Sequence, residues 1–218
     1  MPIILFMEDH KAETISRVVD AVKAYRDEYQ TDDMKFSLAS GPVGVMAATN
    51  EAVSAAQDPM MLYVFGAVIA LCLISFRSIR ATLVVVIPLY VVSVLAQALM
   101  TYLQIGLTVS TLPVIALGVG IGVDYGIYIL STKSLMLKKG ATVQEAYFAA
   151  LKERGSAVLF TGITLAIGVS TWVFSSLKFQ MDMGILLTFM FVVNMLGAII
   201  VLPALARFLW WNKNAPDA

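Results

Sequence analysis

Asp124 is the residue whose type and position best suit it to chemistry, because it lies in the middle of a long apolar stretch. No other acidic or basic residue lies deep within the apolar stretches of the chain. An ionisable group at that depth in a bilayer costs roughly 2.5–3.5 kcal/mol on insertion scales, and such residues are functional by default. A low-dielectric site favours the neutral carboxyl, so we expect Asp124 to bind and release protons. The alternative is a capping or packing role.

Helical spacing places the neighbours of Asp124 on two faces of one helix. The face of Asp124 repeats at intervals of three and four residues and also contains Leu117, Gly120, Ile121, Tyr128 and Ser131. A nearly opposite face has glycines in a small-xxx-small pattern, which lets another helix backbone approach closely; these are Gly118, Gly122 and Gly126. A helix with close contacts on two sides is central in its bundle. We therefore assign helix packing to all four glycines of this segment: Gly118, Gly120, Gly122 and Gly126.

Further hydroxyl groups lie where they could assist the intramembrane carboxyl. Tyr125 and Tyr128 come after it in the same predicted helix. Thr161 and Thr164 lie in the next predicted span, and we take them as possible supports of a proton relay. Threonine hydroxyls in such a span can hydrogen-bond the carboxyl, line a water path or bond back to their own helix. The sequence leaves these alternatives open.

The composition indicates that lipid is the main solvent of this chain. Of its 218 residues, 59% are hydrophobic and 14% are charged, whereas a soluble domain is about 45–50% apolar and about 25% charged. The net charge of zero gives no indication of nucleic-acid binding. The single cysteine, Cys72, excludes an intrachain disulfide. No residue pattern indicates a metal or another cofactor.

Five membrane spans are predicted, because a span needs about 20 apolar residues. Within a transmembrane bundle at 59–210, they cover residues 60–76, 81–102, 108–131, 157–177 and 183–209. The connector between the third and fourth spans contains Thr142 and Glu145, which have the spacing of a helix capping box. We expect a cytoplasmic amphipathic helix over 142–154 that Gly155 ends. It either lies along the membrane surface or packs on the ends of the spans. Residues 211–218 are expected to form a cytoplasmic tail.

Residues 1–58 are predicted to be a water-soluble segment, since acidic residues become sparse after it. Apolar residues predict strands at 2–7 and 34–38, with a helix from Ile15 to Tyr29 between them and another helix at 45–58. A β-α-β unit of about 40 residues is too small to be stable alone. We therefore expect part of a larger α/β subdomain rather than a small independent domain. The predicted fold class is mainly α, a polytopic helix bundle with a partial α/β subdomain at its N-terminus.

Basic residues predict the orientation of the bundle. One side carries nine of them, namely Arg77, Arg80, Lys133, Lys138, Lys139, Lys152, Arg154, Arg207 and Lys213. The short loops of the other side carry one, Lys178. We expect the rich side and the C-terminus to be cytoplasmic, and residues 1–58 to be periplasmic in a Gram-negative cell. An additional span upstream would explain how this segment is exported without a signal peptide.

Four stretches of the chain resemble the resistance-nodulation-division (RND) exporters of the MMPL-type branch. They are FRSIR from Phe76, GVGIGVDYGIY from Gly118, TGITLAIG from Thr161 and LPAL from Leu202. Their order and spacing are similar to the second half of such proteins, from its periplasmic porter subdomain to the C-terminus. The first half and one span have no counterpart in this sequence.

This resemblance implies a proton-driven exporter of lipids or other hydrophobic molecules in the bacterial inner membrane. It places Asp124 and Tyr125 on the proton-relay pair of the family. The coupling ion would be the proton, with no cofactor. The implied partners are membrane lipids, a hydrophobic or lipid substrate, and the other RND half or another copy of this chain; nucleic acid is not among them.

Other classes of protein fit the sequence less well. An intramembrane aspartyl protease needs two carboxylates, one protonated and one ionised, and Asp124 is the only candidate, so we expect no enzyme activity. A sterol-sensing-like bundle that binds lipid for regulation shares the RND membrane architecture and is the main alternative. A non-functional gene fragment, or one subunit of a split transporter, is the other.

Overall fold

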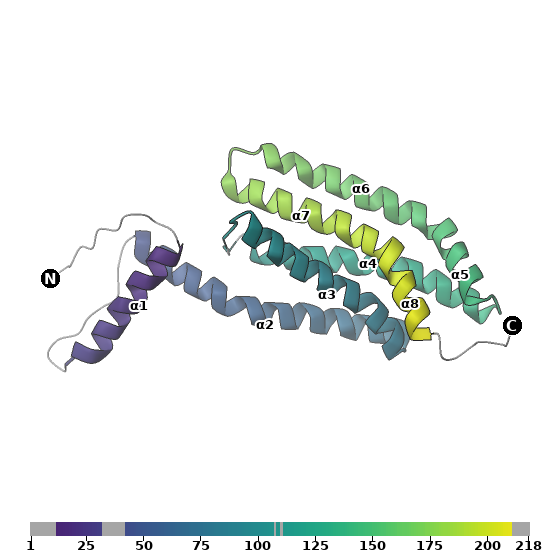
Figure 1. The fold of residues 1–218 in the computed structure, drawn as a ribbon, viewed down its shortest axis with the longest axis horizontal. Coiled ribbons are helices and arrows are strands. Elements are labelled where there is room, and N and C mark those ends of the chain that lie inside the picture. The colour runs from purple at the N-terminus through teal and green to yellow at the C-terminus, as the bar shows by residue number, and fades with distance from the viewer. Residues whose placement is uncertain (1–11, 32–41, 107, 110, 211–218) are drawn as a thin grey trace.

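The computed structural model describes residues 12–31, 42–106, 108–109 and 111–210, which form a bundle of long helices (Figure 1). Five helical segments are long and apolar enough to cross a membrane. Among the described residues there is no strand. The prediction of a mainly α, polytopic bundle with five spans is confirmed.

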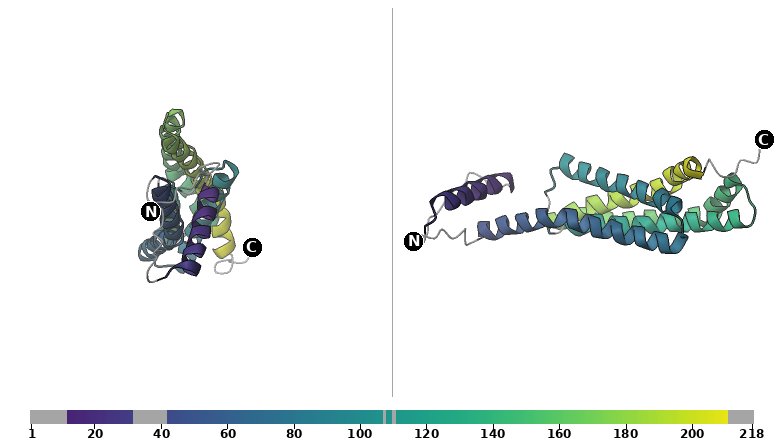
Figure 2. Two further views of the ribbon diagram at one scale, coloured as in Figure 1. Left: turned by 90° about the vertical axis from the view of Figure 1, so that its left-hand side faces the viewer. Right: turned by 90° about the horizontal axis from the view of Figure 1, so that it is seen from below.

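The first membrane helix, α2 (Pro42–Phe76), is longer than its predicted span. We predicted a helix at 45–58 and a separate span at 60–76, and the two are one continuous helix with Pro59 inside it. The N-terminal part of α2 extends beyond the bundle toward the N-terminal helix (Figure 2). After a link of two residues comes α3 (Ile79–Tyr102), whose N-cap residue is Ser78; the Ser78 hydroxyl accepts a hydrogen bond from the amide of Ala81.

The segment before α2 is described only in part. Helix α1 (Ala12–Tyr29) confirms the helix that was predicted between two strands. An ion pair of 3.0 Å between Lys23 Nζ and Glu51 Oε1 joins α1 to the N-terminal part of α2. The expected strands at 2–7 and 34–38 lie outside the described residues. The described residues therefore do not support the α/β subdomain.

The third span, α4 (Leu112–Lys138), extends seven residues beyond the predicted end at 131. It stops at Gly140, which has a φ of 90°. The amide of Gly140 donates to the carbonyl of Leu137 (3.1 Å), and that of Ala141 donates to the carbonyl of Met136 (3.2 Å). This pair of bonds is a Schellman motif, for which a glycine in the left-handed conformation is the usual residue.

The connector helix α5 (Val143–Ala150) begins at the predicted capping box. The hydroxyl of Thr142 accepts from the amide of Glu145 (3.3 Å), and the Glu145 carboxylate accepts from the amide of Thr142 (3.0 Å). The prediction that Gly155 ends this helix is wrong. Gly155 has right-handed dihedral angles, so a π-helical turn, η1 (Leu151–Gly155), passes through it into α6 (Ser156–Ser170).

The last span also contains a π-helical turn. It consists of α7 (Lys178–Leu196), the turn η3 (Gly197–Val201) and α8 (Leu202–Trp210). A short 3₁₀ turn, η2 (Thr171–Phe174), ends the preceding helix. The predicted span at 183–209 is confirmed with a start five residues earlier.

Helix α4 is the most buried of the membrane helices, and α2 and α6 are the least buried. α4 packs against α2, α3, α5 and α7. The buried side chains of α3, α4 and α7 form one apolar cluster. α4 is therefore the best packed of the membrane helices on the side of its buried glycines, and its faces decide where the candidate site lies.

Candidate functional site

Asp124 lies near the middle of α4, about 18 Å from its first residue and about 21 Å from its last along the helix axis. Its side chain is exposed on a face that the other described helices leave uncovered. Two further side chains of this face, Leu117 and Tyr128, are 49% and 53% exposed. Asp124 makes no hydrogen bond or ion pair with any described residue. The described bundle thus presents a carboxyl on its surface, near the middle of a helix that is long and apolar enough to cross a membrane.

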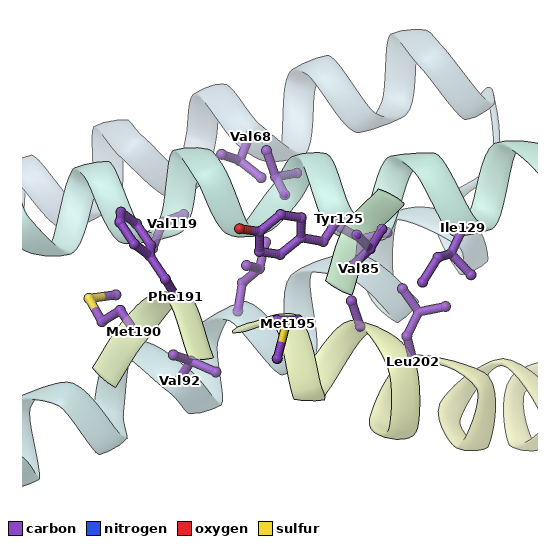
Figure 3. Packing of buried hydrophobic residues seen from close by; sticks show 14 of the residues in the cluster. Val68, Val85, Val92, Val119, Tyr125, Ile129, Met190, Phe191, Met195 and Leu202 are labelled. Carbon is purple, nitrogen blue, oxygen red and sulfur yellow. The ribbon is translucent and has the colours of Figure 1, made fainter. Parts of the chain in front are cut away.

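Tyr125 points into the bundle, away from this surface. Successive helical residues are about 100° apart around the axis, so adjacent side chains point in different directions, and here Asp124 is exposed while Tyr125 is buried. The Tyr125 side chain is 2% exposed and belongs to the same apolar cluster as Val68, Val85 and Met195 (Figure 3). Its hydroxyl has no hydrogen-bond partner among the described residues. The structure therefore does not join Asp124 and Tyr125 by a hydrogen bond.

Three of the four glycines face tightly packed neighbours. A methyl group added at Gly118 would overlap the side chain of Met190, and one at Gly122 would lie 2.6 Å from Asn194 Cγ and from Leu89 Cδ2. At Gly126 it would lie 3.0 Å from a methyl group of Val85. The neighbours that fill this face are side chains of α3 and α7 rather than a helix backbone.

Gly120 differs from the other three. It is exposed on the Asp124 face, and an added methyl group would meet no atom within 4 Å. We predicted close helix packing at Gly120 as well, but no described residue packs closely against it. The reason is helical spacing, because four residues separate Gly118, Gly122 and Gly126 from one another whereas Gly120 lies halfway between two of them.

Asn194 of α7 makes a hydrogen bond to α4 that was not predicted from the sequence. It is buried, and its Nδ2 donates a hydrogen bond of 2.8 Å to the backbone carbonyl of Gly118. The absence of a side chain at Gly122 leaves the space that the amide occupies. The feature of the sequence that could have indicated this bond is the side-chain amide of Asn194 within the apolar run of the fifth span, since such an amide needs a partner in a neighbouring helix. This contact fixes α7 against α4 directly behind the Asp124 face.

The two threonines are placed away from any contact with Asp124. Thr161 and Thr164 are both exposed on α6. Gly162 between them packs on Met195 of α7, where an added methyl group would lie 2.6 Å from its sulfur. No hydrogen bond from either threonine to Asp124 occurs among the described residues. No group of three His, Cys, Asp or Glu side chains that could hold a metal occurs there either.

Comparisons with known proteins confirm the resemblance. The model of the MMPL family matches residues 6–213. The chain is 26% identical over 117 residues to MJ1562 of Methanocaldococcus jannaschii, a protein named as a membrane protein; the match covers 54% of this chain and 30% of that protein. It is 25% identical over 181 residues to ActII-3 of Streptomyces coelicolor, also named as a membrane protein, covering 79% and 26%. The matched part is less than a third of each relative.

Proposed function

We propose that this chain, which belongs to the MMPL family, forms one half of a proton-driven exporter of lipids or other hydrophobic molecules. The observation that carries the proposal is the position of Asp124, an ionisable side chain near the middle of a candidate membrane helix, on a face that the described helices leave uncovered. Such a group is costly in contact with lipid. Its retention is explained if protonation and deprotonation of the carboxyl drive the transport cycle.

A second bundle would cover the Asp124 face. The occupant that we propose is another MMPL-type half. Where no other half is present, a second copy of this chain would take its place. In that assembly the carboxyl faces protein and water instead of lipid, as intramembrane acids generally do. Tyr125 would join the relay after a rotation of α4 or of its own side chain, since its hydroxyl has no partner in the described bundle. Tyr128, Thr161 and Thr164 remain proposed supports.

The class of substrate is inferred from an apolar groove at the outer end of the bundle. Its volume is about 470 Å³, and its walls come from α2, from Val109 and from Leu112 at the start of α4. The lining side chains are small or aliphatic, including Ala48, Ala52, Val53, Val109 and Leu112. A groove of this composition suits a hydrocarbon chain rather than a charged solute.

The proposed location is the bacterial inner membrane, with the C-terminus in the cytoplasm and the N-terminal segment in the periplasm. Nine basic residues on one side against one on the other support this orientation. Single cysteines at Asp182 and at Lys138 should then react with a membrane-impermeant reagent from opposite sides of the membrane.

We propose neither enzyme activity nor a cofactor, with the proton as the coupling ion. A sterol-sensing-like lipid-binding bundle is the second candidate, and the apolar groove would fit it equally well. The two candidates differ in their need for a proton gradient. The chain and an MMPL-type half, reconstituted in vesicles with a fluorescent lipid, should move the lipid only when a pH gradient is imposed. Lipid binding that is unchanged by the gradient, without transport, would favour the sensor.

The covering of the Asp124 face can be tested by photo-crosslinking in membranes. A benzoyl-phenylalanine placed at Leu117, on the Asp124 face, should form crosslinks to protein. The matched control is Leu71 of α2, which is 63% exposed and should crosslink to lipid. Protein adducts of twice the chain mass would identify a second copy, and a different mass would identify another half. Lipid adducts alone at both positions would contradict the proposed assembly.

A further inference from the structure

A hydrogen bond joins the connector helix α5 to the last membrane span, at a distance from the candidate site. The hydroxyl of Tyr147 donates to the backbone carbonyl oxygen of Ile199 over 2.7 Å. The two residues are 52 positions apart in the sequence. The ring of Tyr147 is partly buried and packs against the apolar cluster of the bundle, so its hydroxyl is held in place.

The carbonyl of Ile199 has no donor at the usual helical position, because residue 203 is a proline. In an α-helix, the carbonyl would accept a hydrogen bond from the amide four residues later, and proline has no N–H. Within the π-helical turn η3, the amide of Leu202 donates to the carbonyl of Gly197, five residues earlier. An unpaired carbonyl is costly where water cannot reach it. The hydroxyl of Tyr147 therefore fills a gap that the sequence of the last span creates.

The other end of this bond is also close to an irregular turn. The π-helical turn η1 comes directly after α5. Such turns within α-helices are rare overall, and those that occur often lie at functional sites. Helix α5 is itself well fixed, because its capping box closes its N-terminus and Ala146 and Ala150 are fully buried. The bond therefore connects a fixed short helix to the one place where the last span departs from α-helical hydrogen bonding.

We propose that Tyr147 is a latch between the connector and the last span. Its hydroxyl holds η3 and α8 against α5, so that α5 moves with α8 when the last span changes its bend. Pro203 favours the latch, because it lacks the N–H that would donate to the carbonyl of Ile199 in a regular α-helix. This proposal does not depend on proton coupling or on the identity of the substrate.

Hydrogen exchange on the full chain in lipid nanodiscs tests the latch. Tyr147→Phe removes the hydroxyl and keeps the ring. We expect the amides of α5 and of 197–206 to exchange about fivefold faster, which is the effect of losing one ordinary hydrogen bond. The matched control is Tyr102→Phe, which removes the hydroxyl of a tyrosine that is 83% exposed at the end of α3 and should leave both segments unchanged.

A second variant separates the latch from simple packing of the ring. Pro203→Ala gives Ile199 a helical N–H donor, so Tyr147→Phe on this background should accelerate exchange at 197–206 less than about twofold. If Tyr147→Phe alone fails to fold, recovery of folded protein on the Pro203→Ala background supports the same conclusion. The proposal would be overturned if Tyr147→Phe accelerated exchange equally on the native and Pro203→Ala backgrounds, or failed to fold on both. It would also be overturned if exchange in Tyr147→Phe were no faster than in Tyr102→Phe.

Discussion

Asp124→Asn is expected to abolish proton-driven export while the chain still inserts and folds. Asparagine has nearly the size of aspartate, but its amide does not bind or release a proton near neutral pH. The substitution therefore removes the titrating carboxyl and little else. The side chain makes no ion pair or hydrogen bond among the described residues that the substitution would break. In vesicles that contain this chain and an MMPL-type half, gradient-driven transport of a fluorescent lipid should fall to the level of empty vesicles.

Two companion variants make this result specific to Asp124. Asp182→Asn applies the same chemical change to an acid near the start of α7 and should leave the transport rate unchanged. Tyr125→Phe removes one hydroxyl and keeps the titrating carboxyl, so transport should be slower but should keep its dependence on pH. Native rates and a native pH profile in Asp124→Asn would show that Asp124 is structural.

The number and type of the membrane helices could be predicted because each depends on a local property. An apolar run of about 20 residues has few stable alternatives to a helix in a bilayer, and all five predicted spans are helices. The capping box of α5 is local too, since Thr142 and Glu145 contact each other across three residues.

Helix ends were harder to predict than the helices themselves. We expected the connector helix to end at Gly155, where the chain continues as a helix, and the third span to end at 131, whereas α4 continues to Lys138, just before Gly140. The two glycines differ in the residues on their C-terminal side. Within two residues of Gly140 lies the cap at Thr142, which starts a new helix in a new direction. Gly155 is joined directly to the apolar run of α6, with no cap residue between, so helical hydrogen bonding continues through it.

The sequence grouped the residues of α4 into two faces, but it did not predict which of these faces other helices cover. Periodicity groups residues that share a face, and it does not say which neighbouring helix covers that face. Asp124 and Tyr125 are adjacent in sequence, and α4 therefore turns one outward and the other into the core. The hydrogen bond from Asn194 to Gly118 spans 76 positions, and no local pattern in the sequence specifies such a contact.

Gly122→Ala is expected to destabilise the bundle by about 1–3 kcal/mol, the usual cost of adding a group to a packed core. The added methyl carbon would lie 2.6 Å from Cγ and Nδ2 of Asn194 and from Cδ2 of Leu89. Asn194 cannot retreat without weakening its 2.8 Å hydrogen bond to the carbonyl of Gly118. Denaturant titration of the chain in bicelles, monitored by circular dichroism, would measure the change in the free energy of unfolding.

Gly120→Ala is the matched control for Gly122→Ala, because it makes the same change two residues away in the same helix, where no atom lies within 4 Å. Its free energy of unfolding should stay the same or rise slightly, since alanine is the better helix former. Asn194→Ala creates room beside Gly122, so Gly122→Ala should cost less on that background than on the native one, and the difference measures their coupling. If Gly122→Ala and Gly120→Ala have equal effects, or if Asn194→Ala leaves the cost of Gly122→Ala unchanged, the contact between Asn194 and the glycine face does not hold α7 against α4.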